Sequence, residues 1–508
     1  MNRRAMQPEE PHVQLSSSPR RWLVLSAAAI GAFAATVMAT SVNVALPSLV
    51  DTFDTTFPTV QWVVLAYLLS TSVLLPVIGR LADMLGKKTI FLAGFGVYGL
   101  GSLLCGLAPT IEALIVLRAI QGVGSAILTA IGLAIVTDVF APEERGRAIG
   151  VTGAVLSTGV VIGPTLGGFL VDALGWSWVF LSGVPVGLLG AALAIRYVPA
   201  YGRGEPQRFD LVGAGLLFVT LLAFSLALTV GQSRGFSDWW VLGLFAVSIV
   251  GLNAFLRLER RIEQPLLALE LFANPTLTVG LVSGFITFVA IAGTIFLMPF
   301  YLENVLGYPP AQVGLLMSVT PVLLVITAPL AGLLADRYGE RPITVAGLIF
   351  ILLGYLLIGT LNVHTSALGF ILRFLPLGLG MGTFQTPNNS AIMGSAPRHR
   401  SGVAGGLLAL TRALGQTAGI ALLGSVWAGR VAARSATAAG TGNVVDLPGG
   451  TSAEATAAPA AVQVAGLQDM LLVVQIGVAL ALALCLWDLV RRRKKDLGAK
   501  VGEDRSGE

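Results

Sequence analysis

Charged residues are scarce in this sequence. Of its 508 residues only 12% are Asp, Glu, Lys or Arg, whereas a soluble domain carries about 25%. Fourteen stretches of at least 17 residues contain none of these four residue types, and about 20 apolar residues suffice to span a bilayer as a helix. These stretches exclude a soluble enzyme, a single-pass receptor and a disordered chain. They also disfavour an outer-membrane barrel, whose strands alternate apolar and polar residues.

Cysteine and histidine are almost absent. The two cysteines, Cys105 and Cys485, lie in charge-free stretches, so we expect buried small side chains and neither a disulfide framework nor a metal site. The three histidines have no acid placed to make a catalytic pair. The pattern G-x-x-x-x-G-K-[ST] of nucleotide-binding loops fails at Gly86 and Lys87, because Lys88 follows. We therefore expect no enzyme, no metal and no cofactor.

The positive residues show how the chain crosses the membrane. With a cytoplasmic N-terminus, 26 of the 32 Lys and Arg residues fall inside and three fall outside. This bias predicts a multi-pass protein of the plasma (inner) membrane with both termini cytoplasmic. The stretch 22–50 is too long for a signal peptide, whose apolar region has about 7 to 15 residues. We expect the basic cluster 491–495 to contact anionic lipid rather than nucleic acid.

Two segments of the chain repeat each other. GRLADMLGKK at 79–88 returns as GLLADRYGER at 332–341, an offset of 253 residues. Pairs at similar offsets are Arg145 with Arg398, Arg147 with Arg400 and Arg118 with Arg373. Such duplication is typical of transporters whose substrate site lies where the repeats face each other.

The predicted fold is therefore an all-α integral membrane protein with 14 transmembrane helices, arranged as two six-helix repeats plus an inserted helix pair. Its predicted parts are a cytoplasmic tail 1–21, an N-terminal six-helix repeat 22–197, a linker with the inserted pair 198–258, a C-terminal six-helix repeat 259–490, and a basic cytoplasmic tail 491–508. Segment 428–466, rich in Ala, Gly and Thr, is predicted to be a flexible outer loop. A short amphipathic stretch or a substrate lid within it remains open.

The charged loop at 79–88 resembles the loop signature of the major facilitator superfamily, G-x-L-x-D-x-x-G-[RK]-[RK]. The matching residues are Gly79, Leu81, Asp83, Gly86, Lys87 and Lys88. The glycines allow a tight turn, and an Asp can accept hydrogen bonds from a helix N-terminus. We expect Asp83 to dock on the second half and hold an outward-facing state, with Arg80 or Lys87 near Asp138. Asp336 is the corresponding acid of the second repeat.

Two further signatures of the superfamily follow. In the fourth span Leu114, Arg118, Gln121, Gly122 and Gly124 are similar to a signature with an intramembrane arginine, and in the fifth Gly159, Gly163, Pro164, Gly167 and Gly168 are similar to the antiporter signature G-P-x-x-G-G. An arginine in the membrane should face the interior and have a partner, unless it snorkels to the surface. The antiporter signature is associated with exporters, although plain helix packing can also explain its glycines. We expect leucine to be tolerated less well at Gly163 or Gly167 than at Gly190.

Other matches resemble the 14-span drug:proton antiporter branch. They are Asn43 to Pro47, Gln61 and Trp62 with Tyr67, residues 176–180, Pro265 to Leu267 and Tyr301 to Tyr308. Three positions depart from that branch: Met38 replaces an acid, Ser177 an arginine and Gly183 an asparagine. The resemblance implies a proton as coupling ion, and Glu303 becomes the acid best placed to reach the cavity. Alternatively, Glu303 faces outer water.

The sequence thus favours a secondary active multidrug-type exporter that moves amphipathic compounds out of the cell by alternating access. An exporter of an endogenous lipid or metabolite is the alternative. The expected partners are an amphipathic small molecule, a proton and membrane lipid, with no nucleic acid, and the expected state is a monomer. Candidate cavity or coupling residues, each of which could instead be a helix contact, are Asn43, Trp62, Tyr67, Arg118, Gln121, Tyr301, Glu303, Phe384, Gln385, Asn388, Asn389, Arg412 and Gln416.

Overall fold

The computed structural model describes residues 20–140, 142–199, 211–259, 272–395, 401–438 and 455–506. Within these ranges the protein is helical and contains no strand. Twelve helical segments are long and apolar enough to cross a membrane. Two more helices, α2 (Phe57–Leu85) and α8 (Leu211–Arg234), pack beside them. The all-helical membrane fold is therefore confirmed, and the count of 14 spans stays a prediction.

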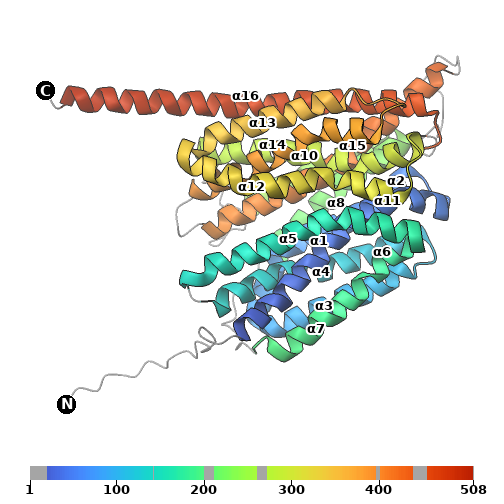
Figure 1. Cartoon of the computed structure of the whole chain (residues 1–508), viewed down its shortest axis with the longest axis horizontal. Coiled ribbons are helices and arrows are strands. Elements are labelled where there is room, and N and C mark those ends of the chain that lie inside the picture. The colour runs from blue at the N-terminus through green and yellow to red at the C-terminus, as the bar shows by residue number, and fades with distance from the viewer. Residues whose placement is uncertain are drawn as a thin grey trace.

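The helices form two bundles that lie side by side in Figure 1. The first contains α1 (Arg20–Phe53), α2, α3 (Lys87–Gly106), α4 (Ile111–Val139), α5 (Pro142–Leu174), α6 (Ser177–Leu181) and α7 (Gly183–Tyr197). The second contains α10 (Pro275–Phe300) with the π-helical turn η2 (Tyr301–Val305), α11 (Pro310–Met317), α12 (Val319–Tyr338), α13 (Glu340–Ile358), α14 (Ala367–Gly394), α15 (Ser401–Ala438) and α16 (Ala460–Ser506). We call them the first and second halves.

The same close helix packing occurs in both halves. In α3 and α4, the Cβ position of Gly101 lies 3.0 Å from the Cα of Gln121. In α13 and α14, the Cβ position of Gly354, 253 residues later, lies 2.9 Å from the Cα of Leu377. Small residues, glycine above all, allow helix backbones to approach this closely. The pair of six-helix repeats stays a prediction; in the register of these two contacts Arg118 matches Phe374 rather than Arg373.

The turns before α3 and α13 are also equivalent. Gly86 has φ +95° and Gly339, again 253 residues later, has φ +89°. Both lie in the left-handed region that glycine occupies at little cost. Each glycine joins two helices directly, so the conformation sets the angle between α2 and α3 and between α12 and α13. The repeated sequence motif thus builds a repeated turn.

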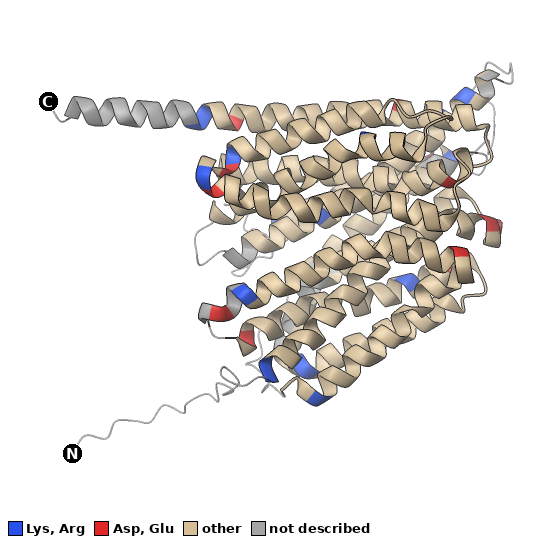
Figure 2. Cartoon of the chain, in the orientation of Figure 1, with Lys and Arg blue, Asp and Glu red and all other residues tan. Residues whose placement is uncertain are grey.

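Lysine and arginine gather at one end of the bundle, where α1 begins and α16 leaves (Figure 2). We call this the basic end, and the other the opposite end. The outer loop predicted at 428–466 is shorter than expected at both ends, because α15 continues to Ala438 and α16 begins at Ala460. Only residues between these helices can form the loop, and 439–454 lie outside the described part. Residues 491–506 extend α16 as a helix.

The inserted pair consists of α8 and α9 (Trp239–Glu259), which pack against each other. Helix α8 also contacts α2 of the first half and α15 of the second. Leu217, Leu221 and Phe255 form a small apolar core there with Leu69. The pair therefore covers one of the seams between the halves.

Candidate functional site

The halves contact each other closely where α5 meets α11. The Cβ position of Gly314 lies 2.2 Å from the carbonyl oxygen of Pro164, and that of Gly168 lies 3.0 Å from the Cα of Gly314. Just beside this contact, the hydroxyls of Thr165 and Ser318 are 2.7 Å apart. The Ser318 hydroxyl also lies 3.0 Å from the Val161 carbonyl oxygen, to which it can donate. Two small residues thus allow backbone contact between the halves.

A second contact between the halves is aromatic. The Phe57 ring at the start of α2 lies 5.5 Å from the Phe296 ring, 5.1 Å from the Phe300 ring and 4.8 Å from the Trp427 ring. Phe57, Phe296 and Phe300 are fully or almost fully buried. Tilted and edge-on ring pairs at these distances stabilise the contact beyond simple burial. This cluster closes the opposite end on the α2 and α15 side.

At the basic end, two ion pairs connect helices of the first half. Arg21 pairs with Glu144 at 2.5 Å and Lys87 with Asp138 at 2.6 Å in the first half. The two hydrogen bonds of Ser318 join the halves, and both lie toward the opposite end. Helices α5 and α12 diverge toward the basic end in Figure 1. Among the residues that the structure describes, these contacts between the halves therefore lie toward the opposite end.

Arg118 is fully buried inside the first half. Its Nε donates to the Val63 carbonyl at 2.9 Å, and its Nη1 to Gln121 Oε1 at 2.7 Å. The guanidinium lies 4.2 Å from the centre of the Tyr67 ring, and the Tyr67 hydroxyl donates to the Ala35 carbonyl or to Ser125. Since Arg118, Gln121 and Tyr67 have almost no exposed surface, they form a packed polar cluster. The interior position predicted for Arg118 is observed.

Glu303 lies in the π-helical turn η2 that ends the long α10 segment. Its side chain is partly exposed, and its Oε2 atom is buried without a hydrogen-bond partner among the described residues. Asp51, near the end of α1, is close enough to interact with it electrostatically. Glu303 is therefore at the junction of the two halves. Single π-helical turns are frequent at functional sites.

The other predicted cavity residues fall into two groups. Tyr301, Phe384 and Asn388 are buried: the Tyr301 hydroxyl donates to the Asn362 carbonyl at 2.7 Å, and Asn388 Nδ2 donates to the Gly280 carbonyl at 3.0 Å. These are contacts within the second half. The residues with accessible surface are Asn43, Trp62, Gln385, Asn389, Arg412 and Gln416. Arg412 is exposed and lies 5.2 Å from the centre of the Phe288 ring.

The loop motif is only partly described. The side chains of Arg80 and Asp83 lie outside the described set, so the expected docking of Asp83 stays a prediction. Lys87 does lie beside Asp138, and Lys88 Nζ donates to the Ile195 carbonyl at 2.9 Å. Asp336 is exposed. In the second repeat Ser390 donates to Glu340 at 2.6 Å, which places a carboxylate where the first repeat has Lys87.

The antiporter signature packs on two sides. The Cβ position of Gly163 lies 1.9 Å from Thr40 Oγ1, and that of Gly167 lies 2.6 Å from the Ser41 carbonyl oxygen, both on α1. The Ser41 hydroxyl donates to the Gly163 carbonyl at 2.7 Å. Gly159 also faces α1, with Phe33 at 3.3 Å, whereas Gly168 faces the second half. Helix α5 therefore links the packing of α1 to the contact between halves.

Two of the departures from the drug antiporter pattern are in contact. A Cβ on Gly183 would lie 3.0 Å from Met38 Cε and 3.0 Å from the Tyr98 hydroxyl. Met38 is 2% exposed. The thioether thus fills space beside a residue without a side chain, and this position offers no carboxylate for a proton.

One buried ion pair was missed by the sequence reasoning. Arg341 Nε lies 2.8 Å from Asp488 Oδ2, and both side chains are at most 3% exposed. Arg341 also donates to the Thr276 carbonyl at 2.5 Å, and Arg492 approaches both Asp488 and Thr276. The pair joins α13, α10 and α16 at the basic end. Asp488 directly follows the charge-free stretch 470–487, and this position at the end of a predicted span could have indicated a buried acid in need of a partner.

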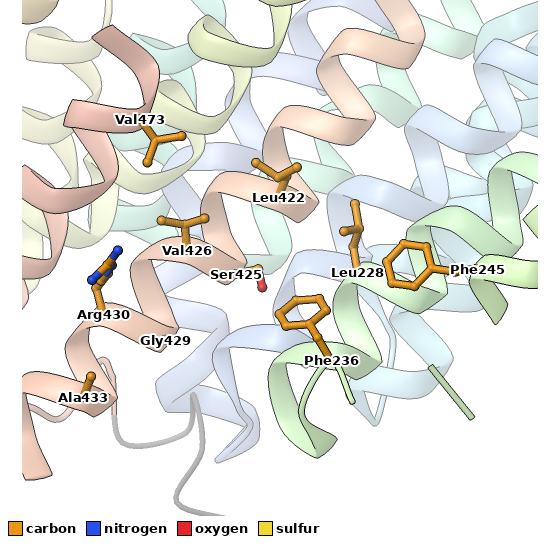
Figure 3. Close-up of a pocket in the computed structure, with 10 residues that line it drawn as sticks. All are labelled: Leu228, Phe236, Phe245, Leu422, Ser425, Val426, Gly429, Arg430, Ala433 and Val473. Atoms are coloured by element: carbon orange, nitrogen blue, oxygen red, sulfur yellow. The ribbon is translucent and has the colours of Figure 1, made fainter. Parts of the chain in front are cut away.

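The structure also contains a side cavity of about 600 Å³ between the inserted pair and the second half (Figure 3). Its lining includes none of the predicted site residues; it is formed by Leu228, Phe236, Phe245, Leu422, Ser425, Val426, Gly429, Arg430, Ala433 and Val473. No cluster of His, Cys, Asp and Glu suited to a metal ion occurs among the residues that the structure describes.

Known proteins with similar sequences are transporters. The riboflavin transporter RibZ of Clostridioides difficile (strain 630) is 34% identical over 410 residues, 80% of this chain and 89% of RibZ. The multidrug transporter protein MdtP of Bacillus subtilis (strain 168) is 30% identical over 80% of this chain and 75% of its own. The multidrug resistance protein Stp of Mycobacterium tuberculosis (strain CDC 1551 / Oshkosh) is 35% identical over 80% of this chain and 76% of its own.

A similar fold is found in a bacterial homolog of the human lysosomal transporter Spinster, solved in an inward-facing and unoccupied conformation. Its TM-score is 0.64 at 17% identity, and the match covers 92% of this chain and 97% of that one. A family model described as Major Facilitator Superfamily matches residues 28–420. The chain therefore belongs to the Major Facilitator Superfamily, as a multi-pass membrane transporter rather than an enzyme, with relatives that include multidrug transporters.

Proposed function

We propose that this chain is a secondary active exporter of amphipathic compounds that works by alternating access. The observation that supports it most is the close contact between the halves toward the opposite end, where α5 meets α11 and Phe57 meets Phe296 and Trp427. A substrate site between the halves would then be reached from the basic end. The partly exposed polar residues, Arg412 and Gln416 among them, are the proposed contacts.

The proposed orientation places the basic end, and both termini, in the cytoplasm of the plasma membrane. Arg20 begins α1, Lys88 lies in the first turn of α3, Arg196 and Arg337 lie in the last turns of α7 and α12, and Arg491 lies on α16. These helix ends belong to the end where lysine and arginine gather (Figure 2), as the positive-inside rule requires. The described state is then inward-facing. Export needs the contacts at the opposite end to separate while the basic end closes, with the loop at 79–88 holding that second state.

Proton coupling through Glu303 is the proposed energy source. A carboxyl group at the junction of the halves changes its environment when that junction opens, and such a change alters its affinity for a proton. Glu303 carries a buried oxygen with no hydrogen-bond partner among the described residues. In the protonated form this carboxyl group is neutral, which favours the closed junction beside Asp51.

Transport into proteoliposomes tests the proposal. Purified protein would be reconstituted, a pH gradient imposed, and the uptake of ethidium, a fluorescent amphipathic cation, followed. We expect uptake that collapses when an uncoupler removes the gradient and that is absent from protein-free vesicles. Uptake equal to that of protein-free vesicles, across a panel of amphipathic cations and neutral compounds, would contradict multidrug export.

Export of an endogenous metabolite is the second candidate, favoured by the 34% identity to a riboflavin transporter. Riboflavin is itself an amphipathic molecule, so one cavity can suit both classes. The same vesicles, preloaded with riboflavin, would show counterflow of labelled riboflavin in this case. Counterflow of riboflavin without ethidium transport would assign the protein to this second class.

A further inference from the structure

The side cavity differs from the proposed substrate site in position. Its walls come from α8 and α9 of the inserted pair and from α15 and α16 of the second half, and Figure 3 shows Phe236 and Phe245 facing the α15 side chains across it. None of the residues in the contact between halves lines it. At about 600 Å³ it is large enough for a small ligand or part of an acyl chain.

The lining is apolar except for Ser425 and Arg430. Arg430 is exposed, and its charge lies close enough to Asp469 to interact with it electrostatically. Its neighbour Arg434 already holds Asp469 through two hydrogen bonds of 2.9 and 2.8 Å. These three groups together leave one net positive charge at the edge of the cavity. A ligand with an anionic group attached to an apolar body would complement both this charge and the apolar lining.

The surface around the cavity has the character of a lipid-facing surface. On α16, Leu472 and Ile476 flank Val473 and are 56% and 63% exposed. At the start of α9, Trp239 and Trp240 are also exposed, with ring centres 3.9 Å apart. Tryptophans concentrate at the level of lipid headgroups. The cavity thus lies beside acyl chains, with Arg430 on the last turns of α15 toward the opposite end.

We propose that this cavity binds an anionic phospholipid of the surrounding membrane, with an acyl chain between the inserted pair and α15 and the phosphate on Arg430. Arginine suits this role because its planar guanidinium makes paired hydrogen bonds to phosphate oxygens. Ser425 offers a hydroxyl inside an otherwise apolar wall. The bound lipid would fill the space that α8, α9 and α15 leave open and so fix the inserted pair to the second half.

Two substitutions test separately how the charge of Arg430 and the volume of the cavity contribute to lipid binding. Arg430→Gln removes the cation and keeps the length of the side chain. Gly429→Leu fills the cavity instead, and no heavy atom lies within 4 Å of the Gly429 Cβ position, so this leucine fits without displacing backbone. Arg234→Gln is the matched control, because Arg234 is another exposed arginine of the opposite end, at the close of α8, and does not line the cavity.

Lipid retention on the full-length protein is the measurement. Protein from nanodiscs with equal phosphatidylglycerol and phosphatidylcholine would be analysed by native mass spectrometry. We expect retained phosphatidylglycerol to exceed phosphatidylcholine in the wild type. Arg430→Gln should lower this preference about fivefold, the change that one arginine near a membrane surface corresponds to. Gly429→Leu should lower retention of both lipids, and Arg234→Gln should change neither.

Three results would overturn the assignment. One is a wild type that retains no phospholipid, or retains the two lipids equally. Another is an Arg430→Gln protein with unchanged preference. The third is displacement of the retained lipid by ethidium together with loss of ethidium binding in Arg430→Gln, which would make the cavity part of the substrate route. Because retention is measured without transport, failure of the proposed export function leaves this test intact.

Discussion

Glu303 is the single residue on which the proposed coupling depends. If its carboxyl group carries the proton, Glu303→Gln cannot exchange one when the junction of the halves opens. We expect this variant to lose substrate-dependent proton movement and to keep downhill substrate exchange. Proteoliposomes with an internal pH dye measure the first, and counterflow of labelled substrate measures the second.

The matched control is Glu112→Gln, which removes an exposed acid at the start of α4, also at the opposite end. It should leave both activities within about twofold of the wild type, since a fully solvated carboxylate need not change environment. Proton flux retained by Glu303→Gln would exclude this residue. Absence of proton flux in the wild type would instead indicate another coupling ion or none.

Arg118 is predicted to matter for stability more than for substrate contact. Arg118→Lys keeps the charge but cannot donate to both Val63 and Gln121 while covering the Tyr67 ring. One buried acceptor left unpaired costs about 1–3 kcal/mol, so the midpoint of thermal unfolding in detergent should fall clearly.

Arg373→Lys is the comparison for Arg118→Lys. Arg373 is partly exposed and bonds to Thr360 and the Gly369 carbonyl near the opposite end. Its substitution should shift the unfolding midpoint much less. Similar shifts for both variants would show that burial of Arg118 contributes little.

At the scale of a single helix, the packing of α5 against α1 predicts the effect of adding a side chain at Gly167. A side chain at Gly167 would meet the Ser41 backbone of α1, with its Cβ 2.6 Å from the carbonyl oxygen and 2.9 Å from the Cα. Gly167→Leu should therefore reduce export more than tenfold at equal membrane abundance, because α1 and α5 must separate to accept it. Export assays in cells, normalised by immunoblot, measure this.

Gly96→Leu on α3 is the appropriate control, since Gly96 is exposed with no atom within 4 Å of its Cβ position. Gly190, which the sequence treats as the more tolerant glycine, is a poor control. Its Cβ position lies 2.2 Å from the Phe95 ring, and Phe95 is buried. Equal loss of export in Gly167→Leu and Gly96→Leu would mean that the signature glycines have no special part.

For the molecule as a whole, alternating access requires the contact between α5 and the second half to break in each cycle. The Thr165 and Ser318 hydroxyls are 2.7 Å apart across it, so cysteines at both positions come close to disulfide distance. We expect the Thr165→Cys, Ser318→Cys protein to lose transport under oxidation and to regain it after reduction. Vesicle uptake with and without dithiothreitol measures both states.

The native background suits this experiment, because Cys105 and Cys485 are both buried and free. Each single-cysteine variant should transport equally with and without oxidant. A cross-linked double variant that still transports at the wild-type rate would contradict the proposed motion. Such a result would leave the fold and the family membership unaffected.

The sequence by itself determined the membrane character, the repeated loop and the family. Each of these depends on local composition or spacing: charge-free stretches long enough to span a bilayer, two copies of one motif 253 residues apart, and signature residues on single helices. A buried arginine in the fourth span also followed from sequence, since an exposed one in lipid is too costly.

The tertiary structure decided which of these residues meet. Arg118, Gln121 and Tyr67 are typical of a polar cavity in sequence, yet they pack against one another, whereas Arg412 and Glu303 keep accessible surface. Two contacts join residues about 150 positions apart: Arg341 pairs with Asp488, and Thr165 contacts Ser318. No periodicity encodes such contacts, because they depend on how whole helices cross. The end at which the halves meet is decided in the same way, by the packing of α5 on α11 and of Phe57 on α10 and α15.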